Sequence, residues 1–282
     1  RTGTGTPSPG GEGAGGWGLR TLRGMRLSTL LAASLLPLAA LAQQLPVSRT
    51  IQATYQKGTR SETGQPGPNY WQNSADYDLN MSFDPGTRRV AGTVDITYRN
   101  NSPDSLRQLW FKLYPNLYQK GAPRASGIKP EDVSEGMQID KLTINGQTVD
   151  AASLRPDATN LTVPVRRAVG PQQTAQVSVT YSYTLNKGSH TRTGEVEPGA
   201  AFVAYFFPRI TVYDDIDGWN RHPYLGSQEF YNDFGTFRAA ITVPRNFVVW
   251  ATGDLLNADQ VLGRTYARRL REAEKKDAVV YI

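Results

Sequence analysis

The chain has 282 residues, with 31 Lys and Arg against 25 Asp and Glu. Without residues 1–42 the balance is 27 against 24, and the cations are scattered apart from a basic run at 264–276. Such a near balance gives no reason to expect a nucleic acid partner. The absence of cysteine excludes a disulfide-stapled fold, so stability must come from a hydrophobic core, which a chain of this length permits.

The first 42 residues predict an exported protein. Residues 1–24 are Gly-rich, have almost nothing apolar to bury and precede Met25; we interpret them as a non-native upstream segment. Residues 25–42 combine a short basic start, a Leu/Ala run and small residues before Gln43, as in a signal peptide cut after Ala42. A membrane anchor is the alternative, but the run is shorter than the roughly 20 apolar residues of a span and Pro37 interrupts it. We expect no stable membrane span and a periplasmic, cell-envelope or extracellular location.

Residues 43–69 are polar and aperiodic, which predicts a flexible linker or surface arm. Residues 76–83 then alternate strictly between polar and apolar side chains, the pattern of a half-buried strand. Asp84-Pro85-Gly86 predicts a turn into a return strand over 90–98, whose inner face includes Gly92. Residues 109–115 predict a strand that is buried on both sides.

The rest of the body also predicts strands. Asn145-Gly146 between two apolar runs indicates a hairpin, and residues 176–185 alternate again. Residues 237–244, 247–256 and 278–282 complete the set, and no segment after the signal peptide shows clear helical periodicity. The prediction is an all-β domain over 70–282, an antiparallel β-sandwich with a saddle-like layout. Because no turn follows 278–282, we expect a fragment cut at the C-terminal end of this domain.

Catalytic chemistry has little support in the sequence. The two histidines, His190 and His222, lie in predicted loops and belong to no H-x-H or H-E-x-x-H pair. There is no cysteine, no G-x-S-x-G and no phosphate-binding glycine loop in the body. We therefore expect no catalytic and no metal-ligating residue in this chain.

The stretch "YFFPRITVYDDIDGW" is the most suggestive of a site. Its three carboxylates, Asp214, Asp215 and Asp217, match no EF-hand spacing, which disfavours calcium. A second interpretation is that they cap a turn, with Arg209 or Arg221 balancing their charge. A third is that the stretch faces a neighbouring domain.

Two stretches, taken together, resemble a known family. They are "YWQNSADYDLNMSF…VAGTVDITYRNNSPDSLRQLWFKLYPN" and "FFPRITVYDDIDGWNRHPYLGSQEFYNDFGTFRAAITVPRNFVVWATGDL". Both are similar, in order and in register, to the N-terminal domain of zinc aminopeptidases of the aminopeptidase N and leukotriene hydrolase type, in their bacterial exported branch. The resemblance covers roughly residues 70–282.

The resemblance implies a β-saddle first domain and a zinc peptidase whose H-E-x-x-H ligands lie in a second domain, absent from this chain. It implies zinc and a peptide substrate for the complete protein, with the missing catalytic domain as partner, and an inactive fragment. The residues that match the family's amine-holding Gln or Glu fall within Ala201 to Tyr205, which carry neither an amide nor a carboxylate. The stretch is then a cleft-rim or domain-docking segment, through Tyr205, Arg209, Tyr213, Asp214, Asp215 and Trp219.

Two other functions remain open at this point. One is a non-catalytic β-sandwich that recognises carbohydrate or protein through exposed aromatics, namely Trp71, Trp110 and Trp219. The other is a family paralogue whose second domain has lost its zinc ligands.

Overall fold

The computed structural model describes residues 46–188 and 190–282. The chain forms two units, residues 1–48 and 49–282, and every element below belongs to the second. The predicted upstream segment and signal peptide lie outside the described residues. Within the described ranges, no helix is long and apolar enough to cross a membrane.

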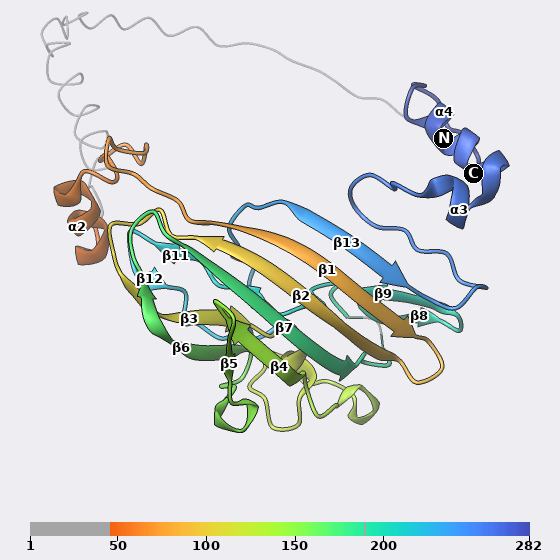
Figure 1. Ribbon diagram of the computed structural model, residues 1–282, viewed down its shortest axis with the longest axis horizontal. Helices are drawn as coiled ribbons and strands as arrows, with labels where there is room; N and C mark the ends of the chain where they lie inside the picture. Colours follow the sequence, from red (N-terminus) through yellow and green to blue (C-terminus); the bar gives the residue numbers. More distant parts are fainter. Residues whose placement is uncertain (1–45, 189) are drawn as a thin grey trace, which may run out of the picture. The chain divides into compact units, whose positions relative to one another are not determined.

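Strands make up most of the described secondary structure (Figure 1). The helices are α2 (Arg49–Lys57), α3 (Ala258–Val261), α4 (Gly263–Ala273) and three 3₁₀ turns, η1 (Tyr114–Tyr118), η2 (Pro130–Asp132) and η3 (Ala151–Ser153). The longer strands are β1 (Ser74–Asp84), β2 (Arg89–Arg99), β3 (Leu106–Lys112), β4 (Gln138–Ile144), β6 (Asn160–Val169), β7 (Thr174–Thr184) and β13 (Phe237–Thr242). The shorter strands are β5 (Gln147–Val149), β8 (Thr193–Glu197), β9 (Ala200–Val203), β10 (Arg209–Ile210), β11 (Tyr213–Asp214) and β12 (Gly218–Trp219).

Two sheets enclose the core of residues 74–242, which we call the β domain. The large sheet has the order β13-β1-β2-β7-β4-β5 and the small one β10-β3-β6. Strand pairs in both sheets are antiparallel except β13, which runs parallel to β1. One continuous core contains side chains of both sheets, among them Leu79, Val94 and Val179 of the large sheet and Phe111 and Leu161 of the small one. This confirms the predicted all-β sandwich.

The alternation of polar and apolar residues in the sequence matches the alternation of exposed and buried side chains along the strands. In β1, Tyr77, Leu79 and Met81 are buried while their neighbours along the strand are exposed. In β2 the inward row includes Gly92, which faces Met81 of β1. A Cβ at Gly92 would lie 2.5 Å from the backbone oxygen of Asn80, so the close approach of the two strands requires glycine there.

The predicted hairpin at Asn145-Gly146 is confirmed as the link between β4 and β5. Both residues have positive φ, 51° and 77°, as a two-residue turn of the primed type requires. The predicted strand over 109–115 differs at its end. β3 stops at Lys112, and the chain continues into η1 with Pro115 in its first turn, because proline fixes φ and has no N–H to donate to a ladder.

The expected irregular arm over 43–69 is wrong for residues 49–57, which form α2. Ile51, Thr54, Tyr55 and Gly58 lie on its less exposed side at helical spacing, and Gly58 ends it with φ 71°. The one fully buried position of the helix is Thr54, whose hydroxyl donates to the Ile51 carbonyl at 2.7 Å. A polar residue at the buried position explains why hydropathy gave no signal.

The C-terminal predictions need correction as well. Residues 237–242 form β13, but 247–256 and 278–282 are not strands, because no strand among the described residues pairs with them. The basic run at 264–276 overlaps α4, and an exposed ion pair joins Arg271 of α4 to Asp259 of α3 at 3.1 Å. The expectation that no helix follows the signal peptide is therefore wrong here too.

Candidate functional site

The stretch Tyr205–Trp219 crosses the β domain as three short strands. β10 pairs antiparallel with β3. Ile210 of β10 and the next two residues, Thr211 and Val212, are buried. β11 and β12 then form a tight hairpin in which Gly218 has φ 72°. The buried middle of the stretch anchors it to the core, so only its two ends have side chains that reach the surface.

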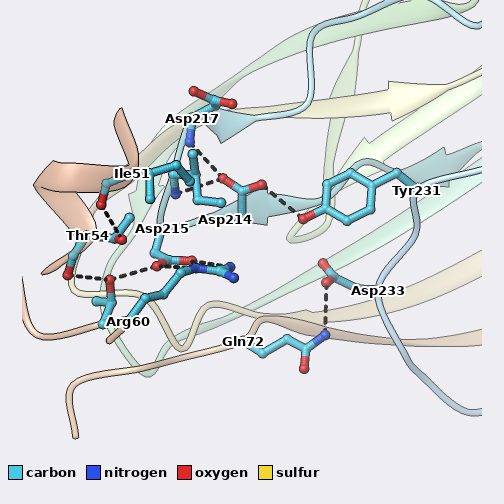
Figure 2. Close-up of polar contacts among 11 residues, drawn as sticks. Ile51, Thr54, Arg60, Gln72, Asp214, Asp215, Asp217, Tyr231 and Asp233 are labelled. Atoms are coloured by element: carbon cyan, nitrogen blue, oxygen red, sulfur yellow. Dashed lines mark hydrogen bonds and ion pairs between the residues drawn. The ribbon is translucent and has the colours of Figure 1, made fainter. Parts of the chain in front are cut away.

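The Asp214–Asp217 turn is built by carboxylates that accept hydrogen bonds (Figure 2). Oδ1 of Asp214 accepts from the backbone N–H groups of Ile216, at 3.0 Å, and Asp217, at 2.8 Å. Oδ2 of Asp214 accepts from the Tyr231 hydroxyl at 3.0 Å. The turn-capping interpretation of this cluster is confirmed for Asp214.

Asp215 plays a different part, because its side chain is only 2% exposed. Nη2 of Arg60 lies 2.8 Å from Oδ1, Nε lies 3.0 Å from Oδ2, and the Thr59 hydroxyl donates to Oδ2 at 2.7 Å. Burial alone would raise the pKa of Asp215, but the hydrogen bonds from Arg60 and Thr59 outweigh it and hold that pKa below its ordinary value. This contact joins the segment after α2 to the β11–β12 turn. The predicted charge partners, Arg209 and Arg221, are wrong for this carboxylate.

Arg209 and Arg221 are instead stacked on aromatic rings. The Arg209 guanidinium lies 5.1 Å from the ring centre of Phe237 and 5.6 Å from that of Tyr77, and it donates to the Asp233 carbonyl at 2.7 Å. Arg221 lies 5.5 Å from the ring of Trp110. Both arginines therefore hold rings and backbone rather than the aspartate turn.

Asp233 is the carboxylate with the least favourable environment near the turn. Burial raises its pKa to about 6, and the hydrogen bond from Gln72 and the charge of Arg209 offset only part of that effect. The Gln72 side-chain amide donates to Asp233 Oδ1 at 3.5 Å, which is long for a hydrogen bond; Figure 2 draws this contact. Because the pKa of Asp233 is higher in the folded state than in the unfolded state, its protonated form stabilises the fold at pH values below the unfolded pKa. That contribution is lost as pH rises through the folded-state pKa of about 6.

Replacing Asp233 with asparagine is expected to stabilise the chain at pH 8 by about 1–2 kcal/mol and to leave it unchanged near pH 4. The amide stays neutral at both pH values, while the native carboxylate must be charged at the higher one. Urea unfolding at the two pH values measures the difference. Asp217→Asn, which changes an exposed carboxylate of the Asp214–Asp217 turn, is the matched control and should show no such pH dependence. Equal pH dependence in both variants would contradict the assignment.

Trp219 belongs to the interior, not to an exposed surface. It is 5% exposed, its ring centre lies 6.2 Å from that of Tyr98, and Tyr213 packs edge-on against it at 5.0 Å. Tyr213 stacks in turn on Trp71 at 5.6 Å and donates its hydroxyl to Asp104 at 2.8 Å. The expectation of an exposed Trp219 is wrong, whereas Trp71 and Trp110 are partly exposed.

Tyr205 lies at the other end of the stretch, in a separate aromatic cluster. Its ring stacks on Phe230 at 3.8 Å, and Tyr114 and Tyr224 pack around that pair. Tyr205 itself has a positive φ of 55°, which is uncommon for a bulky residue. The Tyr205 end of the stretch therefore packs in an aromatic cluster, whereas its Asp214–Asp217 end forms a hydrogen-bonded polar turn.

Two further polar centres were not predicted. Lys112 is 3% exposed, and its Nζ donates to Asn160 Oδ1 at 2.7 Å and to the His222 carbonyl; burial lowers its pKa to about 8. Asp132, with a fully buried side chain, accepts from His190 Nε2 at 2.9 Å. The lysine within the apolar run "LWFKLYP" was the available signal for the first centre. The partner of His190 is distant in the sequence, and no signal marked it.

These arrangements bind segments together but contain no assembled catalytic group. In the described ranges, no three His, Cys, Asp or Glu side chains converge in a way that could hold a metal ion. The donors around Asp214 and Asp215 are occupied by backbone, Tyr231, Thr59 and Arg60. A zinc site does not fit these residues.

Comparison with known proteins gives a partial likeness of fold. No family profile and no curated protein sequence matches the chain. The M1 zinc metallopeptidase from Deinococcus radiodurans is 17% identical over 64% of this chain and 34% of that one, with a TM-score of 0.35. Yeast LTA4 hydrolase in complex with bestatin is 13% identical over 71% and 27%, with a TM-score of 0.31.

A third structure, Legionella pneumophila aminopeptidase A in complex with aspartic acid, is 14% identical over 42% of this chain and 10% of that one, with a TM-score of 0.25. The chain spans about a third of the length of the first of these proteins.

Proposed function

We propose that the β domain is the N-terminal scaffold domain of an exported zinc aminopeptidase and packs against the domain that carries the zinc. The observation that carries this proposal is that residues of the family-resembling stretches lie in the buried core of the β domain. Val90, Ile96, Tyr98, Leu109 and Phe111, all from the first resembling stretch, are at most 1% exposed. The pattern therefore coincides with the positions that determine the packing of this fold.

The polar residues of the same pattern support the proposal more specifically. Asn100 is fully buried, and its Nδ2 donates to the carbonyl groups of Asp104, at 2.8 Å, and Val169, at 2.9 Å. Asn116 is also fully buried; it donates to the Ala158 carbonyl and accepts from the Met137 N–H. Generic sandwiches need buried apolar side chains, but these asparagines suit only one particular set of loops.

The surface beyond the core supports a docked partner domain. Large apolar side chains are exposed within residues 234–261, namely Phe234 at 83%, Leu256 at 87%, Trp250 at 63%, Val248 at 58% and Val261 at 56%. We propose that these side chains form the surface that the partner domain covers. Tyr205, Arg209, Tyr213 and Asp214 are partly exposed and are proposed as the cleft-rim or docking residues. Asp215 and Trp219 act on that surface only by holding the turn and its rings in place.

In the complete protein the zinc would activate water and polarise the peptide carbonyl. This chain's own contribution is the shape of the cleft wall and the exclusion of water and bulky substrates by the rim. Export is proposed on the signal-like pattern of residues 25–42.

The test is to compare the 282-residue chain with the product of its complete gene. We expect the chain alone to release no amino acid from aminoacyl-nitroanilides or peptides. The complete product is expected to do so, to lose activity with a chelator and to regain it with zinc. Peptidase activity in the chain alone, or a complete gene without H-E-x-x-H, would contradict the proposal. A complete product that retains the fold but binds no zinc would favour the inactive paralogue.

Hydrogen exchange on the same two proteins tests the docking surface. Amides within residues 234–256 are expected to be better protected in the complete protein. The β4–β5 hairpin at Asn145-Gly146 serves as the internal reference and should exchange equally in both. Equal exchange at both places would rule out docking through this surface.

A further inference from the structure

An open groove lies between the edges of the two sheets, beside the β4–β5 hairpin. Its volume is about 460 Å³, within the usual range of sites for small organic ligands. One wall is the end of β4 with the hairpin and β5, and the other is residues 164–167 of β6. β5 and β6 are the outermost strands of their sheets (Figure 1). The groove is therefore the open side of the sandwich, where the core meets solvent.

The lining of the groove includes apolar side chains of the core. Ile144 is 6% exposed and belongs to the core, and Val149 and Val165 are partly buried and pack against it. Gln147 lies opposite Ile144 in the β4–β5 register, so its side chain shares the inward face of the sheet. The groove thus offers apolar surface and an amide to the body of a ligand.

A bulge in β6 brings two consecutive arginines to this groove. β3 has one residue between Leu106 and Gln108, whereas β6 has four between the partners of these two, residues 165–168. Consecutive side chains of a regular strand point to opposite faces. Because the ladder is interrupted by the bulge, Arg166 and Arg167 both line the same groove.

Both guanidinium groups are available to a ligand. Arg166 and Arg167 are exposed, and neither has a hydrogen bond or ion pair with another residue of the described ranges. The lining residues include no carboxylate. Asp150, which follows β5 directly, accepts from the Ala152 N–H at 3.0 Å in the cap of η3 and does not line the groove. The positive charge of the groove is therefore not neutralised by its own walls.

The same features favour a small anion over a peptide strand. Pro164 has no N–H to offer to an added strand, and the bulge interrupts the edge of β6, so both features oppose pairing with another chain. Two guanidinium groups on neighbouring residues suit an anion with its charge concentrated on one group. A phosphate monoester carries nearly two negative charges and three acceptor oxygens on such a group, whereas a carboxylate or a sulfate ester carries one charge.

We propose that this groove binds a small phosphate monoester. The phosphate oxygens accept hydrogen bonds from Arg166 and Arg167, and the organic body packs on Ile144, Val149 and Val165. The proposal stands independently of the peptidase proposal, because none of these residues belongs to the rim segment or to the proposed docking surface.

Calorimetric titration of the 282-residue chain with phenyl phosphate at pH 8, where this ester is a dianion, tests the site. Arg166→Gln and Arg167→Gln are each expected to weaken binding roughly tenfold, the loss of hydrogen bonds to a charged group. Arg89→Gln is the matched control, because Arg89 is an exposed strand arginine that does not line the groove. It should leave the affinity within about twofold of the native value.

Two further ligands separate charge from shape. Phenyl sulfate has the same shape with one negative charge less and is expected to bind more weakly than phenyl phosphate. Inorganic phosphate has no organic body to pack on the apolar lining, so it too should bind more weakly. All three arginines are exposed, and their variants are expected to keep the native Tm. If Arg167→Gln does not fold, Arg166→Gln gives the same measurement.

Vesicles distinguish a lipid headgroup from a soluble ester, because phosphatidic acid presents the same phosphate monoester. Sedimentation with phosphatidic acid vesicles, but not with phosphatidylglycerol vesicles of equal total charge, and its loss in Arg166→Gln would assign the ligand to a lipid. Saturable binding of phenyl phosphate without vesicle binding would assign it to a soluble ester. Absence of both would overturn the proposal. Equal losses in Arg166→Gln and Arg89→Gln, or phenyl sulfate binding as tightly as phenyl phosphate, would also overturn it.

Discussion

Arg60→Ala is expected to destabilise the fold by about 3 kcal/mol, a large effect for one side chain outside the core. The substitution leaves the Asp215 carboxylate buried with only the Thr59 hydroxyl to satisfy it, and it removes hydrogen bonds at 2.8 Å and 3.0 Å. Most of the loss comes from the unpaired buried charge rather than from the attraction itself. Urea unfolding at neutral pH measures it.

The double variant Arg60→Ala with Asp215→Asn separates the two contributions. Because the neutral amide needs no counter-charge, the double variant should recover at least half of the lost stability. Arg107→Ala, at an exposed position of β3, is the control and should change stability by less than about 0.5 kcal/mol. The contribution of the pair should also fade as the solution is acidified through the lowered pKa of Asp215, since that carboxylate stabilises the fold only while charged. An Arg60→Ala variant as stable as the Arg107→Ala control would show that α2 is not anchored in this way.

Trp219→Ala is expected to cost about 3–5 kcal/mol, the usual loss when a buried indole is truncated in a core. Its ring fills the space between Tyr98 and Tyr213, so the cavity removes contacts on both sides. Trp219→Phe should cost less than half as much, because it keeps one aromatic ring in the same place. Urea unfolding and the near-ultraviolet circular dichroism of the folded state report the change.

Trp250→Ala is the matched comparison, because this tryptophan is 63% exposed. In the 282-residue chain it should change stability by less than about 0.5 kcal/mol. In the complete protein the same substitution is expected to weaken the contact with the partner domain that we propose. Similar losses for Trp219→Ala and Trp250→Ala in the chain alone would contradict the distinction between interior and docking tryptophans.

The parts of the fold that were predictable are those determined by local patterns. Two-residue alternation identified β1 and its inward row, and Asn145-Gly146 identified its hairpin, because each signal is contained within a dozen residues. The turn-capping part of the aspartate cluster was also predictable, since Asp214 accepts from residues two and three positions ahead.

The parts that were missed depend on partners far away in the chain. Arg60 and Asp215 are 155 residues apart, and nothing in either sequence neighbourhood marks the other. Arg209 and Arg221 are closer to Asp215 in the sequence, yet their guanidinium groups pack on the rings of Phe237 and Trp110 instead. Residues 247–256 have strand composition, but β structure forms only where a neighbouring strand accepts its hydrogen bonds. Pairing of this kind is a property of the tertiary structure.

The parallel neighbour of β1 has a consequence for the order of assembly. β1 pairs with β2 as soon as the next fifteen or so residues exist, but its other side pairs with Phe237–Thr242, which leaves the ribosome much later. Until then the nascent sheet presents an open flank that could recruit the wrong strand. Pairing across so long a stretch of chain slows folding, because the intervening loop must close before these hydrogen bonds form.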